Sequence, residues 1–114
     1  MPSLAGQTGG LQSGVAYSAS KVAVLGITRS AARDRALLGI TVNAIASGPI
    51  DTPMLAQATG RSKTGTRYTK LDSIPRVRVG LPEEIAAASS FLTSVNGGYV
   101  TGATIDVNRG QFMH

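Results

Sequence analysis

Two side chains near the N-terminus have the types and the spacing suited to proton transfer to a carbonyl or alcohol oxygen, and a serine lies nearby in the sequence. Tyr17 and Lys21 lie four residues apart at the start of an apolar segment with helical periodicity, and Ser3 lies a short loop upstream. Residues four apart share one face of a helix, so the phenol and the ammonium group project together. A neighbouring ammonium group stabilises the phenolate form, and a phenol in this setting can donate or accept a proton.

The elements that must position these residues follow from the periodicity of the sequence. Residues 1–16 are rich in glycine, serine and glutamine, which predicts a loop. From Tyr17 to about Leu37 apolar residues recur with helical spacing, and Gly39 is suited to ending that helix. Residues 40–46 are apolar and rich in β-branched side chains, which is typical of a buried strand in a parallel sheet. A helix followed directly by such a strand indicates an α/β fold.

The second half of the chain predicts one more helix and one more strand. Residues 51–75 are polar and basic without periodicity, which predicts an irregular segment that is either a functional lid or a disordered piece. A helix is expected over residues 82–94, because a proline and two acidic residues occupy its first turn. A turn at residues 96–98 and a last strand at residues 103–107 follow. The residues of this helix expected to face inward are Ile85, Ala88, Phe91 and Leu92.

Composition limits the classes of protein to consider. The 114 residues are 42% apolar and 15% charged, which indicates a folded chain of one small domain or part of one. The sequence has no cysteine and one histidine, His114, so we expect no disulfide framework and no metal site; this fits a reducing compartment, and we expect a cytoplasmic protein. No basic region precedes an apolar core at the N-terminus, and no apolar run is long enough to span a bilayer, so neither a signal peptide nor a membrane partner is expected.

The net charge of +5 raises the possibility of a basic binding module. The basic residues are scattered, and few aromatic residues accompany them, so solvated surface charge is the favoured interpretation and no nucleic-acid partner is expected. One basic cluster lies within the expected lid, where it could also meet an anionic substrate or carrier; its members are Arg61, Lys63, Arg67 and Lys70.

Four segments, in order along nearly the whole chain, resemble motifs of the short-chain dehydrogenase/reductase family. They are YSASK at residues 17–21, similar to YxxxK; VNAIASGPIDTPM at residues 42–54, similar to VNAxxPGxxxTxM; IPRVRVGLPEEIA at residues 74–86, similar to PxxRxGxPEEIA; and YVTGATIDVNRG at residues 99–110, similar to YxTGxxxxVDGG. Asn108 and Arg109 depart from the last motif.

The resemblance implies the C-terminal half of a doubly wound parallel sheet of the Rossmann type, with residues 1–114 as a partial domain. It also implies an oxidoreductase that moves a hydride between NAD or NADP and a small-molecule ketone or alcohol, and a homo-oligomer. Tyr17 takes the position of the catalytic acid or base, and Lys21 that of the lysine that stabilises the phenolate and holds the nicotinamide ribose. Ser3 takes the position of the serine that polarises the substrate oxygen; Ser13 is the competing serine and lies too close to Tyr17 in sequence for the usual arrangement.

The same resemblance places four residues beside the nicotinamide. They are Gly48, Pro49, Ile50 and Thr52. A flat ring with a carboxamide needs close approach of the backbone and nearby polar groups, which a glycine, a backbone amide and a threonine hydroxyl supply. The sequence departs from the motif here, because the usual proline before the glycine is Ser47 and a proline follows the glycine instead.

The glycine-rich phosphate loop of the family has no counterpart in the sequence. Two interpretations follow. The chain belongs to a reductase most similar to 3-oxoacyl-carrier-protein reductases, and is then expected to be inactive alone; or it is a catalytically inactive fragment that keeps only oligomerisation surfaces. In the lid, Met54, Leu55 and Tyr68 either line an apolar pocket or form a small satellite cluster. The sequence does not determine the substrate, the preference for NAD or NADP, or the direction of the reaction.

Overall fold

The computed structural model describes residues 3–9, 14–58 and 78–113. The described elements follow in the order α1 (Leu4–Thr8), α2 (Gly14–Arg35), a 3-10 turn (Ala36–Leu38), β1 (Ala44–Ser47), α3 (Pro53–Ala58), α4 (Pro82–Thr93), a second 3-10 turn (Val95–Gly97) and β2 (Thr104–Val107). Within these residues, none of the helices combines the length and the apolar character needed to cross a bilayer.

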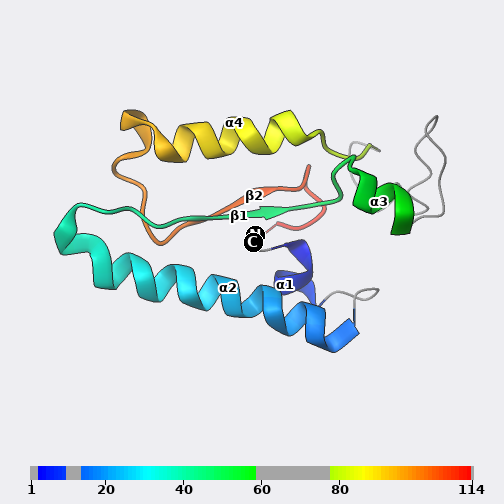
Figure 1. Ribbon diagram of the computed structural model, residues 1–114, viewed down its shortest axis with the longest axis horizontal. Helices are drawn as coiled ribbons and strands as arrows, with labels where there is room; N and C mark the ends of the chain where they lie inside the picture. The colour runs from blue at the N-terminus through cyan, green and yellow to red at the C-terminus, as the bar shows by residue number, and fades with distance from the viewer. Residues whose placement is uncertain (1–2, 10–13, 59–77, 114) are drawn as a thin grey trace.

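The two strands form a parallel sheet between two layers of helix. β1 pairs with β2, with Ala44 opposite Thr104 and Ser47 opposite Val107. Figure 1 shows α4 over one face of the sheet and α1 and α2 over the other. Parallel neighbours need a crossover connection, and α4 lies in the segment that joins β1 to β2. Helices on both faces of a parallel sheet confirm the predicted α/β class.

The core is built from small and medium apolar side chains of the three layers. Its buried members are Leu25, Ala32, Ala44, Ile45, Ala46, Val79 and Leu92. Ala46 is fully buried at the centre of β1. β1 is therefore covered on both faces, as the run of apolar residues at its position predicted.

The ends of the helices follow the sequence signals. Gly39 adopts a left-handed conformation with φ of 71°, and its N–H donates to the Ala36 carbonyl at 3.0 Å, so the predicted stop is confirmed. At the start of α4, the Glu84 carboxylate accepts a hydrogen bond from the Leu81 N–H at 2.8 Å. Pro82 occupies the first turn, where no backbone donor is needed.

The expected loop over residues 1–16 is wrong in part. α1 forms within it, with the Ser3 hydroxyl accepting a hydrogen bond from the Ala5 N–H at 3.3 Å as the N-cap. Gly9, with φ of 80°, ends α1, and α2 already begins at Gly14 rather than at Tyr17. The loop prediction failed because a five-residue helix has too few residues to show a period.

The strand expected over residues 40–46 begins only at Ala44. The Asn43 side chain explains the difference, because it takes part in the pairing that a backbone ladder would otherwise make. Its amide group donates to the Val100 carbonyl at 2.7 Å, and its oxygen accepts from the Ala103 N–H at 3.1 Å. The last strand likewise covers Thr104–Val107, within the predicted range.

Two further expectations need correction. The irregular segment predicted at residues 51–75 contains α3, whereas the rest of it, including Tyr68 and the basic cluster, lies within residues 59–77, outside the described residues. Phe91 of α4 is 47% exposed and does not face inward, whereas its neighbour Leu92 is buried. Leu92 alone supplies the large buried side chain of the C-terminal turn of α4.

Candidate active site

The first two turns of α2 bring Tyr17 and Lys21 together, as their spacing predicted. The Lys21 Nζ lies 5.0 Å from the centroid of the Tyr17 ring, over its face. Tyr17 is 43% exposed, so the residue is only partly shielded from solvent. A cation at this distance from an aromatic face interacts favourably with the ring and keeps the two side chains in one region.

Ser3 lies at the junction of α1 with the sheet. Its backbone forms a parallel bridge with Ser47, the last residue of β1. Ser3 therefore stands beside the carboxyl end of β1, where ligands bind in open parallel sheets. Its hydroxyl caps α1, so the same oxygen that the sequence assigns to the substrate also holds the helix.

The packing of α1 on α2 sets the position of Ser3 relative to Lys21, because Ser3 caps α1 and Lys21 lies on α2. Gly6 sits so close to α2 that a Cβ atom there would lie 2.8 Å from the Lys21 carbonyl carbon and 2.9 Å from the Lys21 Cβ. Only glycine permits this approach. The glycine three residues after Ser3 therefore has a steric reason.

We expect Gly6→Ala to destabilise the chain by about 1–3 kcal/mol, because the added methyl group must push α1 away from Lys21. Denaturant unfolding followed by circular dichroism measures the change. Gly26→Ala is the matched control: Gly26 lies inside α2 with no atom within 4 Å of the added Cβ, so alanine there should stabilise by about 0.5–1 kcal/mol. Equal effects of the two substitutions would contradict the α1–α2 contact.

The loop after β1 carries the residues predicted to lie beside a nicotinamide. The Gly48 N–H donates to the Val107 carbonyl at 3.1 Å and extends the parallel ladder by one step. The Thr52 hydroxyl donates to the Ile50 carbonyl and accepts from the Leu55 N–H, both at 3.3 Å, at the start of α3. Thr52 therefore shapes the turn from the loop into α3.

The same loop is held against the segment before α4. Ile50 and Gly80 form a parallel bridge, in which the Gly80 N–H donates to the Pro49 carbonyl at 2.9 Å and the Asp51 N–H donates to the Gly80 carbonyl at 2.8 Å. A Cβ at Gly80 would lie 2.7 Å from the Ile50 Cδ1, so the Ile50 side chain would have to shift to admit a larger residue there. Pro49 has no N–H to donate, and it takes part in the bridge only through its carbonyl, which accepts the Gly80 N–H.

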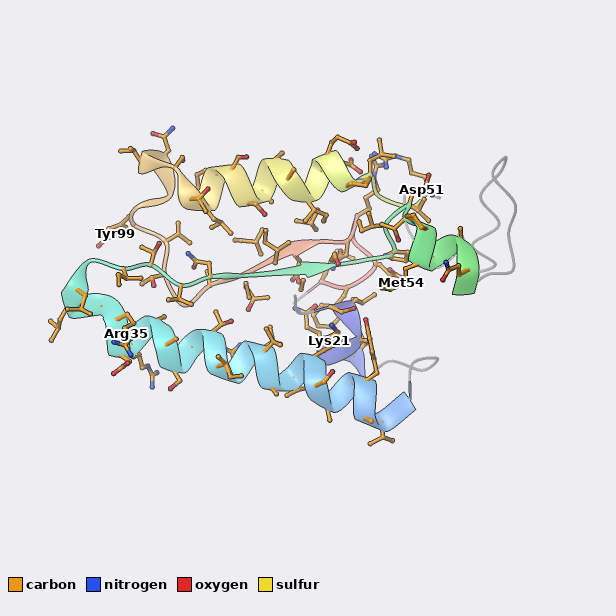
Figure 2. All side chains as sticks on the ribbon, viewed as in Figure 1. Lys21, Arg35, Asp51, Met54 and Tyr99 are labelled. Carbon is orange, nitrogen blue, oxygen red and sulfur yellow. The ribbon has the colours of Figure 1, made fainter. Side chains whose placement is uncertain are left out.

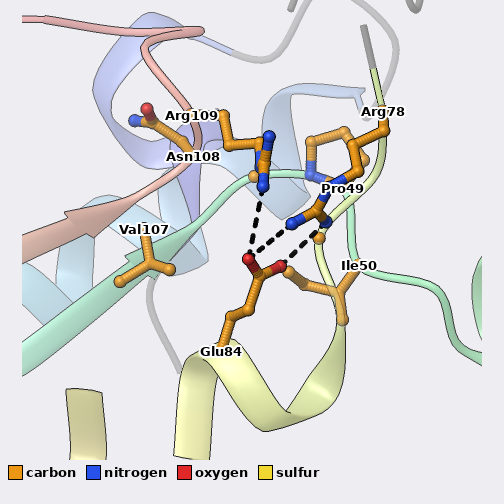
Figure 3. A pocket seen from close by; sticks show the side chains of 9 residues that line it. Pro49, Ile50, Arg78, Glu84, Val107, Asn108 and Arg109 are labelled. Carbon is orange, nitrogen blue, oxygen red and sulfur yellow. Dashed lines mark hydrogen bonds and ion pairs between the residues drawn. The ribbon is translucent and has the colours of Figure 1, made fainter. Parts of the chain in front are cut away.

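Sequence reasoning missed one cluster beside this loop. Glu84 receives two hydrogen bonds from the Arg78 guanidinium, at 2.6 and 2.9 Å, and its Oε1 lies 3.5 Å from an Arg109 nitrogen. Figure 3 shows the two arginines converging on the Glu84 carboxylate, next to Pro49 and Ile50. Arg78 and Glu84 belong to a motif that the sequence analysis quoted, but no role was assigned to them.

The cluster changes the acidity of its members. The pKa of Glu84 falls from 4.5 to about 2, first because Arg78 hydrogen-bonds the carboxylate, then because the Leu81 N–H does, with smaller contributions from the charges of Arg78 and Arg109. The pKa of Arg78 is raised, chiefly by its hydrogen bonds to Glu84. Glu84 and Arg78 therefore both stay ionised throughout the neutral range.

The free energy of unfolding is expected to decrease at acidic pH, because Glu84 becomes protonated. Its folded-state pKa of about 2 is below the ordinary 4.5, so the stabilisation is complete above pH 4.5 and is lost as the pH falls toward 2. Urea midpoints measured at several pH values between 2.5 and 6 should show this loss, and Glu84→Gln should flatten the profile. Glu83→Gln, on the same exposed turn of α4, is the control and should leave the slope unchanged.

The described structure places the predicted site residues in two groups. Tyr17 and Lys21 lie on α2, with α1 and Ser3 packed beside them, and the loop from Gly48 to Thr52 leaves the carboxyl end of β1. Figure 2 shows Lys21 and Met54 at the end of the sheet from which α3 extends. Met54 is 79% exposed, and Tyr68, its expected neighbour in the lid, lies outside the described residues. No group of three or more metal-ligating side chains occurs in the described ranges.

Comparison with known proteins identifies the family of this chain. A family model described as enoyl-(acyl carrier protein) reductase matches residues 1–111. A 3-oxoacyl-[acyl-carrier-protein] reductase of Vibrio cholerae is 42% identical over 97 residues, which are 85% of this chain. The chain belongs to the short-chain dehydrogenase/reductase family.

Solved structures of this family superpose closely on the chain. A 3-oxoacyl-[acyl-carrier protein] reductase from Brucella melitensis gives a TM-score of 0.84 at 33% identity, over 99% of this chain. A blue fluorescent protein from a metagenomic library, solved in complex with NADPH, gives 0.83 at 36% identity over 98% of the chain. The chain spans 38% of the length of the Vibrio cholerae protein and 41% of the Brucella chain.

Proposed function

We propose that this chain is the catalytic C-terminal part of an NAD(P)-dependent short-chain reductase. The reaction is the reduction of a 3-oxoacyl-like ketone, or the reverse oxidation of a secondary alcohol. The observation that carries the proposal is the Lys21 ammonium group over the Tyr17 ring at the start of α2. The packing of α1 beside this pair and the bridge from Ser3 to β1 support it.

The donor set fits a nicotinamide nucleotide. Lys21 supplies an ammonium group for the ribose hydroxyls, and the loop from Gly48 to Thr52 supplies backbone and hydroxyl groups at the carboxyl end of a parallel strand. The bound dihydronicotinamide supplies the hydride that reduces the carbonyl carbon. The residues of this chain then hold the nucleotide and manage the proton.

Each of the three polar side chains has a separate task. The Ser3 hydroxyl donates a hydrogen bond to the carbonyl oxygen and stabilises the negative charge that develops on it. The Tyr17 hydroxyl gives its proton to that oxygen, and the Lys21 charge stabilises the phenolate that remains. In the oxidative direction the same phenolate takes the proton from the alcohol.

A second candidate is a non-catalytic fragment that associates with other chains. It is favoured by the large share of the relatives that the chain does not cover and by apolar side chains exposed on α2, such as Val15, Val22 and Ile27. In that case the catalytic side chains are a remnant of the family sequence.

A chimera separates the two candidates. It joins the part of the Vibrio cholerae reductase that precedes the matched 97 residues to this chain. Reduction of acetoacetyl-CoA, a simple 3-oxoacyl substrate, with NADPH or NADH is followed by the loss of cofactor absorbance. We expect turnover by the chimera and none by the 114-residue chain alone. A folded chimera that binds cofactor without turnover would favour the non-catalytic candidate.

A further inference from the structure

The cofactor loop proposed above is clamped between two segments that come from different parts of the chain. On one side, Pro49 and Asp51 are hydrogen-bonded to Gly80, in the segment that leads into α4. On the other side, Gly48 is hydrogen-bonded to Val107, and a Cβ at Gly48 would lie 3.1 Å from the Asn108 Cα. The position of the loop therefore depends on the separation of these two segments.

Glu84 joins the two segments. Its carboxylate binds Arg78 and the Leu81 N–H, which belong to the segment before α4. The same Oε1 that accepts from Arg78 also faces Arg109, which follows β2. Figure 3 shows both guanidinium groups approaching the carboxylate, with Pro49 and Ile50 beside them. The three charged side chains therefore connect the two segments that hold the loop.

Arg109 reaches this position from a strained backbone. It is the non-glycine residue with positive φ in the described part of the chain, at 55°, and it stands where the family motif has glycine. Glycine would adopt this conformation at a lower energetic cost. Such a residue persists where its surroundings hold it, and Arg109 has its side chain only 25% exposed and directed at Glu84. The asparagine before it fixes the turn, because the Asn108 side chain accepts from the Gly110 N–H at 2.9 Å.

We propose that Arg109 is a positioning residue for the cofactor loop: through the carboxylate it shares with Arg78, it fixes the separation of the two segments that hold Gly48, Pro49 and Ile50. The proposal rests on the proposed function, because the loop has this use only if a nicotinamide binds there. Arg109 itself need not touch cofactor or substrate. The ion pair of its guanidinium with Glu84 holds the turn after β2 in place. This interaction offsets the energetic cost of the strained backbone at Arg109.

Hydrogen exchange of single backbone amides, measured by NMR on the 114-residue chain, tests the proposal without cofactor or turnover. The reporters are the amides of Asp51 and Gly80, which close the bridge to the loop. The references are the amides of Ala44 and Gly102, which donate to Ala103 and Val42 away from the charged cluster. The ratio of reporter to reference exchange rates cancels any change in global stability.

We expect Glu84→Gln to speed the reporters about tenfold relative to the references, since hydrogen bonds to a charged group are lost. Arg109→Ala should speed them several-fold, and Arg109→Lys, which keeps the cation, should restore most of the protection. Glu83→Gln is the matched control and should leave the ratio unchanged. Equal acceleration of reporters and references, failure of the lysine to rescue, or reporters unprotected in the unchanged chain would each overturn the proposal. None of these outcomes bears on whether Tyr17 transfers a proton.

Discussion

Replacing Tyr17 by phenylalanine in the chimeric reductase is expected to lower kcat at least about 100-fold, the range in which a lost general acid falls. The substitution removes the transferable proton and keeps the ring on which the Lys21 ammonium group rests. Because the ring and its packing remain, KM for the cofactor should change little. Steady-state kinetics with acetoacetyl-CoA and NADPH measure both constants.

The control for this substitution is Tyr99→Phe. Tyr99 is fully exposed and lies at the far end of the molecule from Lys21, as Figure 2 shows. It should leave kcat and KM unchanged. Turnover of Tyr17→Phe within a few-fold of the unchanged chimera would show that another group donates the proton, and the assignment of Tyr17 would be wrong.

The sequence predicted the elements in which a periodic pattern extends over many residues. It missed those that depend on single contacts. α2 and α4 were predicted because apolar spacing, an N-terminal proline and a C-terminal glycine agree over many residues. α1 was missed, because its five residues are fixed by the Ser3 cap and by the contact of Gly6 with α2. The start of β1 was placed too early, because Asn43 replaces ladder bonds with side-chain bonds, which no periodicity shows.

The candidate site divides in the same way. The pairing of Tyr17 with Lys21 follows from helical spacing alone, and the structure shows it. The charged cluster around Glu84 could not be predicted from spacing, because Arg109 lies far along the chain and meets Glu84 only when β2 pairs beside β1. The one signal in the sequence was the arginine at the glycine position of the closing motif.

The second prediction with a large expected effect is self-association of the chain, and it arises from the outer edge of β1. In the described residues β1 pairs with β2 on one side, and on the other side its contact is the single bridge from Ser47 to Ser3. A groove runs along this edge between α2 and α4; its lining residues are Val24, Thr28, Ile40, Thr41, Val42, Asn43, Ala44, Ile45, Ser89, Leu92 and Thr93. An unpaired edge of an apolar strand is a template for another chain.

We therefore expect the 114-residue chain to form dimers or larger species, or a loosely packed monomer. The exposed apolar residues Leu37, Leu38 and Ile40 continue the apolar surface at one end of the groove. Size-exclusion chromatography with light scattering gives the mass, and a thermal melt gives the cooperativity. Ile40→Lys should shift the distribution toward monomer, because a charge in the groove opposes pairing. Val95→Lys, at an exposed residue outside the groove, should not. A strict monomer with a sharp cooperative transition would contradict the expectation, because the unpaired edge of β1 would then drive neither association nor loose packing.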